Sequence, residues 1–204
     1  MRIGIIGTGN IGGGLGRAWA RAGHAITFGV RHTDDADTVA LAREIGATVA
    51  SIPEALASAE VIALATPFGA VPAVASALPD WTRRVVIDCT NPIGPGFKLL
   101  HGHTDSGAEA VARLLPGARV VKSFSAQGAE VLAHPVYDGV PASNFYCGDD
   151  AEAKAVVKRL VEDVGFEAID AGGLASARYL EPITMLWITM SRTLGRDFAF
   201  KVLR

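Results

Sequence analysis

The feature that most constrains this chain is a glycine-rich turn close to its start. Residues 2–6 have the apolar pattern of a short buried strand, and Gly7-Thr8-Gly9-Asn10-Ile11-Gly12 follows at once as G-x-G-x-x-G. A helical pattern then begins, whose apolar face carries Ile11, Leu15, Ala18, Trp19 and Ala22. A strand, a glycine turn and a helix in this order predict a dinucleotide-binding unit.

The spacing of the three glycines has a chemical reason. Gly7 permits a tight turn, Gly9 lets the backbone approach a pyrophosphate, and Gly12 lets the helix pack close to the strand. The free N–H groups at the start of the helix and the helix dipole then face the two phosphates. A glycine-rich turn in some other α/β protein is the less favoured interpretation, because the strand and the helix are both present.

Composition excludes several classes of protein. Half of the 204 residues are hydrophobic and a fifth are charged, which is typical of a globular protein and excludes disorder. The net charge of −2 gives no reason to expect nucleic acid or an anionic membrane as a partner, and the apolar runs are too short to span a bilayer. The N-terminus lacks the pattern of a signal peptide, and Cys89 and Cys147 are expected as buried thiols, so we expect a cytoplasmic protein.

Strand and helix patterns alternate along the chain. Strands are expected at residues 2–6, 25–29, 48–50, 60–65, 84–88, 118–122, 143–147 and 166–169, and a long apolar helix is expected to start near residue 176. This alternation predicts an α/β fold of the Rossmann type, a doubly wound and mainly parallel sheet with helices on both faces and a short C-terminal helical extension. We expect residues 1–204 to form a single domain.

Local signals mark the ends of several helices. Asp34 or Asp35 is expected to cap the helix that ends at Ile45, and Ser51 with Glu54 has the spacing of a capping box. The first helix also contains Gly13, Gly14 and Gly16, each of which costs about 1 kcal/mol relative to alanine. We expect these glycines to allow close approach of a ligand or of another backbone.

The residue after the second strand indicates which nucleotide is bound. NAD-binding members of this fold carry a carboxylate there, about 20 residues past the glycines, that bonds the ribose 2′-hydroxyl. Here the place reads Gly29-Val30-Arg31-His32, and no acidic residue precedes Asp34. Arg31 suits the 2′-phosphate of NADP, and His32 could stack on the adenine or add a donor. The alternative is that Arg31 is a solvated loop charge.

Other strand ends are expected to line the same cleft, because ligands of such sheets bind at the carboxyl ends of the strands. These segments are Thr66-Pro67 with Phe68, Asn91-Pro92, and residues 123–128. Thr66, Pro67, Asn91 and Pro92 are therefore predicted to bind the cofactor together with the glycine turn, Arg31 and His32.

Acid–base chemistry is sparse elsewhere. His101, His103 and Asp105 could suggest a metal, but the segment has the pattern of a solvated loop with no fourth ligand. Lys122, at the end of a strand, could donate a proton, bind a phosphate or simply close the strand. We assign no catalytic residue and no metal site. Hydride transfer between two cofactor rings depends on orientation and on the exclusion of water more than on a protein acid.

Several stretches together resemble one family, the NADPH-dependent coenzyme F-420 reductases, and also the oxidoreductase domain of the STEAP metalloreductases. The stretches are Gly7 to Gly12, Arg31, Thr90-Asn91-Pro92, Val120-Val121-Lys122-Ser123-Phe124, and Asp170-Ala171-Gly172-Gly173-Leu174-Ala175-Ser176-Ala177-Arg178-Tyr179-Leu180-Glu181. The resemblance covers essentially the whole chain. The C-terminal stretch is more specific than the glycine turn, which many families share.

The resemblance implies a hydride transfer between nicotinamide C4 of NADP(H) and the ring of a deazaflavin (F-420) or flavin. The glycine turn, including Thr8, would bind the phosphates and Arg31 the 2′-phosphate. Residues 1–122 would form the dinucleotide-binding core. Residues 123–204 would complete a second-substrate site, shaped by Asn91, Pro92, Phe124 and the loop Gly172-Gly173-Leu174.

Two departures from the family pattern affect these expectations. The family usually has a serine before the arginine, and Val30 stands there, which removes one hydroxyl contact to the 2′-phosphate. The family often has Phe-Asn-Thr after the sixth strand, whereas this chain has Phe124-Ser125-Ala126. The second substrate therefore stays open between a deazaflavin and a flavin.

Two alternative functions stay open at this point. One is an NADP-dependent reductase of a small imine, ketone or hydroxy acid, for which a shared-helix dimer would compensate for a missing helical domain. The other is a non-catalytic NADPH-binding sensor. The last helix carries an apolar stripe of Leu180, Ile183, Leu186, Trp187 and Met190, which is expected to pack in the core or to form a homodimer interface.

Overall fold

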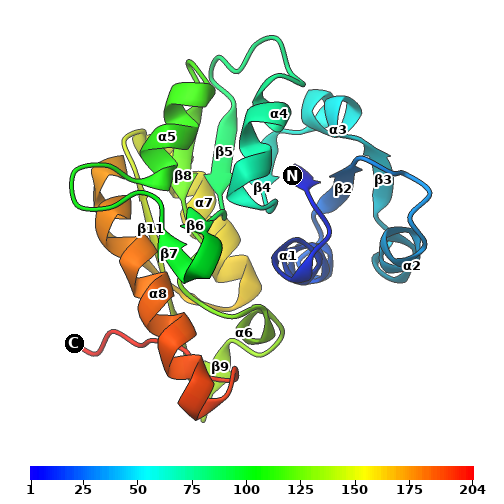
Figure 1. Ribbon diagram of the computed structural model, residues 1–204. Helices are drawn as coiled ribbons and strands as arrows, with labels where there is room; N and C mark the ends of the chain where they lie inside the picture. The colour runs from blue at the N-terminus through cyan, green and yellow to red at the C-terminus, as the bar shows by residue number, and fades with distance from the viewer.

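The computed structural model describes residues 1–204 and contains an eight-stranded sheet with helices on both faces (Figure 1). The strand order is β12-β11-β8-β5-β4-β1-β2-β3. The strands are β1 (Arg2–Ile6), β2 (Ala25–Val30), β3 (Thr48–Ser51), β4 (Val61–Leu64), β5 (Val85–Asp88), β8 (Arg119–Lys122), β11 (Ser143–Gly148) and β12 (Glu167–Asp170). Every one of these strands was expected from the sequence, with ends that differ by at most one residue.

The strands from β3 to β8 in this order all pair in parallel, whereas β11 runs antiparallel to β8 and β12 runs parallel to β11. The parallel strands therefore end at one common edge, which we call the carboxyl edge. Strand order reverses between β1 and β4, because β2 and β3 lie on one side of β1 and β4, β5 and β8 on the other. Ligands of doubly wound sheets bind at such a reversal.

Helices cover both faces of the sheet. They are α1 (Asn10–Arg21), α2 (Ala36–Ile45), α3 (Ile52–Ser58), α4 (Val71–Ala75), α5 (Gly107–Leu114), α6 (Ala129–Ala133), α7 (Ala151–Val164) and α8 (Ala177–Leu194). One core lies under α1, α2, α6 and α7 and contains Ile3 and Ile5 of β1, while the other lies under α3, α4, α5 and the start of α8 and contains Ile6. Helices on both faces and a C-terminal helix confirm the predicted fold class.

Short-range signals set several helix ends as expected. Asp35 caps α2 by accepting the N–H of Thr38 at 2.9 Å, and Gly46 ends this helix with φ of +68°. Ser51 donates its N–H and hydroxyl to Glu54 Oε2 at the start of α3. The short strands β6 (Ile93–Gly94), β7 (Lys98–Leu99), β9 (Val136–Tyr137) and β10 (Val140–Pro141) were not anticipated.

The extra glycines of α1 make room for side chains rather than for a ligand or another backbone. A Cβ on Gly14 would lie 2.8 Å from Leu132 of α6, and a Cβ on Gly16 would lie 2.5 Å from the ring of Phe28 in β2. The expectation of a backbone or ligand contact was wrong at these two positions, because α1 lies close against both α6 and the sheet. None of the helices has both the length and the apolar character that crossing a membrane requires.

Candidate nucleotide-binding site

The glycine turn has the tight geometry that its sequence predicts. Gly7 has φ of +103°, and a Cβ there would lie 2.7 Å from the carbonyl oxygen of Ala65. A Cβ on Gly12 would lie 2.0 Å from the carbonyl oxygen of Gly7, so the first turn of α1 packs directly on the end of β1. A Cβ on Gly9 would meet nothing within 4 Å. Gly7 and Gly12 are therefore required by the fold, while Gly9 faces open space.

The start of α1 presents unpaired N–H groups. The N-cap is Gly9, which has no side chain to accept them, and the first turn contains no acidic residue. The N–H groups of Asn10, Ile11 and Gly12 make no hydrogen bond within the chain. An uncapped helix start with a positive dipole end is suited to binding an anion such as a pyrophosphate.

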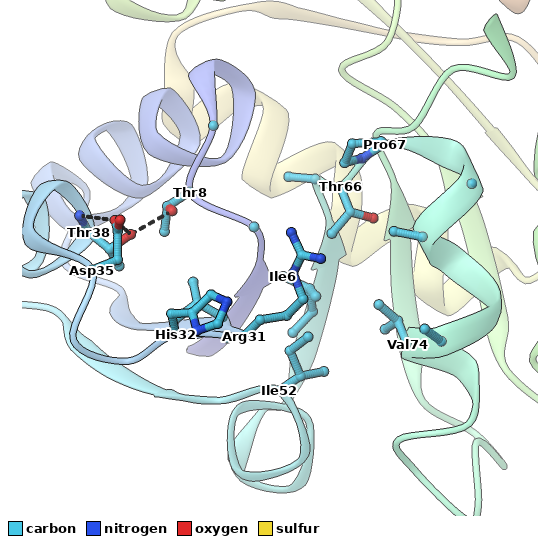
Figure 2. A pocket seen from close by; sticks show the side chains of 18 residues that line it. Ile6, Thr8, Arg31, His32, Asp35, Thr38, Ile52, Thr66, Pro67 and Val74 are labelled. Atoms are coloured by element: carbon cyan, nitrogen blue, oxygen red, sulfur yellow. Dashed lines mark hydrogen bonds between the residues drawn. The ribbon is translucent and has the colours of Figure 1, made fainter. Parts of the chain in front are cut away.

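A cavity of about 750 Å³ opens beside the turn, between the ends of β1, β2 and β4 (Figure 2). Its polar side chains are those of Thr8, Arg31, His32, Asp35, Thr38 and Thr66, and its apolar walls include Ile6, Ile52, Pro67 and Val74. The structure thus brings together the predicted residues Gly7, Thr8, Gly9, Arg31, His32, Thr66 and Pro67. Asn10 lies on the opposite side of the turn, in a second hollow that also contains Arg17.

Arg31 lies directly after β2 and is exposed. Its guanidinium extends into the cavity in Figure 2 and has no hydrogen bond or ion pair with any group of the chain. Arg17, on the neighbouring helix, is by contrast held by two hydrogen bonds of 2.9 Å to Glu44. An unpaired guanidinium at this place is available to grip a phosphate with two parallel hydrogen bonds.

A chain of hydrogen bonds links the glycine turn to the start of α2. The Thr38 hydroxyl donates to Asp35 Oδ2 at 2.7 Å and lies 2.8 Å from the Thr8 hydroxyl oxygen (Figure 2). The hydrogen bonds from Thr38 hold the pKa of Asp35 below its usual range. Thr38 was missed in the sequence, although the D-x-x-T spacing of a capped helix start could have indicated it.

Thr66 follows β4 at the same cavity. Its hydroxyl oxygen is buried and has no hydrogen-bond partner within the chain. Buried hydroxyl groups in proteins are nearly always paired, so this one is available to a ligand at the carboxyl edge. Together with the open space at Gly9, the unpaired N–H groups of α1 and Arg31, it shows that the residues present fit a dinucleotide phosphate.

Asn91 lies farther along the carboxyl edge and does not line the cavity. Its side-chain Nδ2 donates to the Ser125 carbonyl at 3.2 Å, and its Oδ1 accepts the Thr184 hydroxyl at 3.1 Å. Thr184 also lies 2.8 Å from the Ser125 carbonyl, so these groups tie the ends of β5 and β8 to α8. Pro92 packs against Gly107, where a Cβ would lie 2.9 Å from its ring.

Phe124 follows β8 at the carboxyl edge, but its ring does not face a ligand. It is 1% exposed and packs edge-on against Trp19 at 5.7 Å and Phe166 at 6.4 Å. A positive φ of +56° accompanies this placement of the side chain in the core. The apolar ring is more stable in the core than at the edge, so it does not line the carboxyl edge, and the expected part of Phe124 in a second-substrate site stays a prediction.

The loop Gly172-Gly173-Leu174 lies at the opposite edge of the sheet. Because β11 runs antiparallel to β8 and β12 follows β11, the end of β12 lies beside the start of β8. Gly172 accepts the N–H of Gly148 at 3.1 Å, and Leu174 shares a hollow with Arg119 and Val120. The antiparallel strand β11 thus places this loop away from the carboxyl edge, and its expected part in a second-substrate site stays a prediction.

Lys122 is neither exposed nor free. Its ammonium lies 3.0 Å from Asp88 and 3.3 Å from Glu181, contacts the Thr90 carbonyl, and is 0% exposed. Burial acts to lower the pKa of Lys122, but the two carboxylates outweigh it and raise the value. Glu181 also accepts the N–H groups of Gly107 and Ala108 at the start of α5, at 2.8 and 3.0 Å. The lysine therefore closes its strand and does not reach a ligand.

Comparisons with known proteins point to one family. Residues 2–92 match the family described as NADP oxidoreductase, coenzyme F420-dependent. The F420-dependent NADP reductase of Methanothermobacter thermautotrophicus is 33% identical, over 94% of this chain and 89% of that protein.

This chain belongs to that family.

The chain is also similar to a metalloreductase and to solved structures. Metalloreductase STEAP3 of Rattus norvegicus is 31% identical to this chain. The match covers 90% of this chain but only 36% of the metalloreductase. A crystal structure of a protein assigned as an F420-dependent NADP reductase, from Arthrobacter sp. FB24, superposes with a TM-score of 0.88 at 29% identity and covers 99% of both chains. A reductive aminase of Aspergillus terreus shares only the fold, with a TM-score of 0.71 at 20% identity over 61% of that chain.

Proposed function

We propose that this protein transfers a hydride between NADP(H) and a deazaflavin of the F420 type, with a flavin as the second acceptor class. The observation that carries the proposal is the unpaired guanidinium of Arg31 in the cavity beside the glycine turn. The Methanothermobacter thermautotrophicus relative, which matches over 89% of its length, is an F420-dependent NADP reductase. This similarity supports NADP as the nucleotide and F420 as the acceptor.

The residues of the chain would divide the nucleotide between them. The unpaired N–H groups of α1 would hold the pyrophosphate, Arg31 the 2′-phosphate, and His32 and Ile52 the adenosine side of the cavity. Thr66 and Pro67, after β4, would set the position of the nicotinamide half at the carboxyl edge. NADPH, when bound, supplies the hydride from C4 of its nicotinamide.

The carboxyl edge beyond the cavity carries amide and hydroxyl groups but no free acid. Asn91, the Ser125 carbonyl and the Thr184 hydroxyl bond to one another there, Ser125 and Thr184 being buried, and Lys122 is buried among carboxylates. None of these groups is placed to deliver a proton to a ring at this edge. Such an edge suits an acceptor whose proton exchanges with water, and residues 123–204 would supply its far side as part of one working unit.

Spectroscopy with purified protein tests the proposal. NADPH is mixed with oxidised F420, FMN or FAD, and with a cyclic imine and a ketone, and loss of acceptor or NADPH absorbance is followed. We expect bleaching of F420 or a flavin and none with the imine or the ketone. Turnover of the imine alone would assign the protein to reductases of small substrates. Tight NADPH binding without any turnover would indicate a sensor.

We also propose a homodimer formed through α8. The face of this helix that points away from the core carries Tyr179, Leu186 and Leu194, each more than half exposed, and Phe97 lies next to it under Arg192. An apolar stripe of this length on a helix surface is typical of an interface. Sedimentation analysis is expected to show a dimer that Leu186→Glu converts to a monomer, and a monomeric mass for the unmodified protein would refute the interface.

Two free buried cysteines, Cys89 and Cys147, support a reducing compartment such as the cytoplasm. Fractionation of the producing cell would test this placement, and recovery of the protein outside the cytoplasm would contradict it.

A further inference from the structure

The cavity beside the glycine turn contains an acidic side chain as well as a basic one. Asp35 lines the same cavity as Arg31, and His32 lies between the two in Figure 2. Asp35 Oδ2 accepts both the N–H and the hydroxyl of Thr38, at 2.9 and 2.7 Å, whereas Oδ1 accepts no hydrogen bond from the chain. The carboxylate has no cationic partner at ion-pair distance, so its charge is not neutralised locally.

The hydrogen bond that Asp35 accepts from the Thr38 hydroxyl also decides how Thr8 can act. The Thr38 hydroxyl has one proton, and it is donated to Asp35, because a carboxylate can only accept. In the 2.8 Å contact between the two hydroxyls, Thr8 must therefore be the donor and Thr38 the acceptor. The lone pairs of the Thr8 oxygen are then left for the cavity. Thr8 in this state accepts a hydrogen bond and repels a phosphate oxygen.

We propose that Asp35 is a second determinant of nucleotide choice, acting against Arg31, so that the protein separates NADP from NAD by a narrower margin than Arg31 alone would set. The 2′-phosphate of NADP is attracted by the guanidinium of Arg31 but repelled by the charge of Asp35 and by the acceptor oxygen of Thr8. The 2′-hydroxyl of NAD can donate to such an oxygen at no electrostatic cost. The inference rests on the proposed nucleotide site, although not on the identity of the hydride acceptor.

The test is the ratio of the dissociation constants for NADH and NADPH, measured by nucleotide fluorescence on the purified chain. Asp35→Asn keeps a side-chain oxygen for Thr38 and removes the charge, and Asp35→Ser is a second neutral capping variant in case the first folds poorly. Asp37→Asn is the matched control. It removes the same charge from the first turn of the same helix, but Asp37 lines the hollow on the other side of the turn.

We expect Asp35→Asn to lower the dissociation constant for NADPH about three- to tenfold, which is the size of one charge interaction near a protein surface. The dissociation constant for NADH should change less than about twofold. Thr38→Val keeps the shape of this buried residue, frees the Thr8 hydroxyl to donate, and is expected to shift the ratio in the same direction. An unchanged ratio in both Asp35 variants, or an equal shift in Asp37→Asn, would overturn the inference while leaving the nucleotide site intact. Failure of the unmodified protein to bind either nucleotide would overturn the proposed function and this inference together.

Discussion

Two cationic side chains lie at the ends of parallel strands, at the same edge of this sheet, and differ in burial and in pairing. Arg31 follows β2, is exposed and has no partner, whereas Lys122 ends β8, is 0% exposed and meets Asp88, Glu181 and the Thr90 carbonyl. The strand positions are equivalent, so the difference lies in what covers each strand end. A cavity lies over β2, while α5 and α8 bring a carboxylate and a capped helix start over β8.

The comparison separates two uses of polar groups. Around Arg31, the N–H groups of α1, the Thr66 hydroxyl and the guanidinium itself have no partner in the chain. For the buried Thr66 hydroxyl this costs stability unless a ligand pairs it. The groups that Lys122 contacts, Asp88, Glu181 and the Thr90 carbonyl, are paired within the chain. The groups left unpaired at the glycine turn, Arg31 and Thr66 are thus free for a ligand, and the buried ion cluster belongs to the framework that keeps the carboxyl edge in place.

The largest expected effect is on the framework side. Lys122→Met leaves Asp88 and Glu181 buried without their cation, which is expected to lower the free energy of unfolding by about 3–5 kcal/mol. Urea denaturation measures the change. Lys158→Met, which breaks an exposed pair with Glu162, is the matched control and is expected to cost less than about 1 kcal/mol. Equal losses of unfolding free energy in the two variants would show that the buried cluster around Lys122 stabilises the fold no more than an exposed ion pair.

The glycine turn contains both kinds of position within a few residues. Gly12→Ala places a Cβ 2.0 Å from the Gly7 carbonyl oxygen and is expected to cost about 3 kcal/mol of stability, at the upper end for overpacking. Gly9→Ala meets no protein atom, so stability should fall by less than about 1 kcal/mol while NADPH binding weakens. Thermal unfolding and nucleotide titration of both variants separate the two roles. Unchanged NADPH binding in Gly9→Ala would show that Gly9 does not face the nucleotide.

The variant Arg31→Ala tests the role of the unpaired guanidinium in the binding region. Loss of a charge-assisted contact to the 2′-phosphate is expected to weaken NADPH binding by about 1–3 kcal/mol and to leave NADH little changed. Stability should not fall, because Arg31 has no partner in the chain. Calorimetric titration with both nucleotides measures the difference, and equal weakening of the two would refute the 2′-phosphate role.

The smallest expected effect concerns a half-exposed ion pair that belongs neither to the binding region around Arg31 nor to the ion cluster around Lys122. Arg113 donates two hydrogen bonds to Asp105 and is the main cause of lowering the pKa of that carboxyl to about 2. Since the folded pKa lies below the unfolded one, the pair stabilises the protein above about pH 4 and loses its contribution as pH falls towards 2. Solvent limits this contribution to less than about 1 kcal/mol. Arg113→Ala should flatten the acid limb of a stability–pH curve, and an unaltered limb would contradict this account.

Several features could be predicted because they depend on neighbours in the sequence. The strand–turn–helix at Gly7 to Gly12 and the Asp35 cap are set by residues a few positions apart. Alternating elements and short crossovers set the strand order from β3 to β8, so the place of Arg31 beside the turn followed from the sequence as well.

What the tertiary structure alone decided lies after β8. The reversal of β11 moved Gly172 and Leu174 to the far edge, and no local pattern shows whether a strand will pair parallel or antiparallel. Core packing turned Phe124 inward, and a carboxylate 59 residues along the chain paired Lys122. Whether a polar side chain binds a ligand or supports the fold depends on which groups reach it from distant elements. For Arg31 no such group arrives, and for Lys122 two carboxylates do.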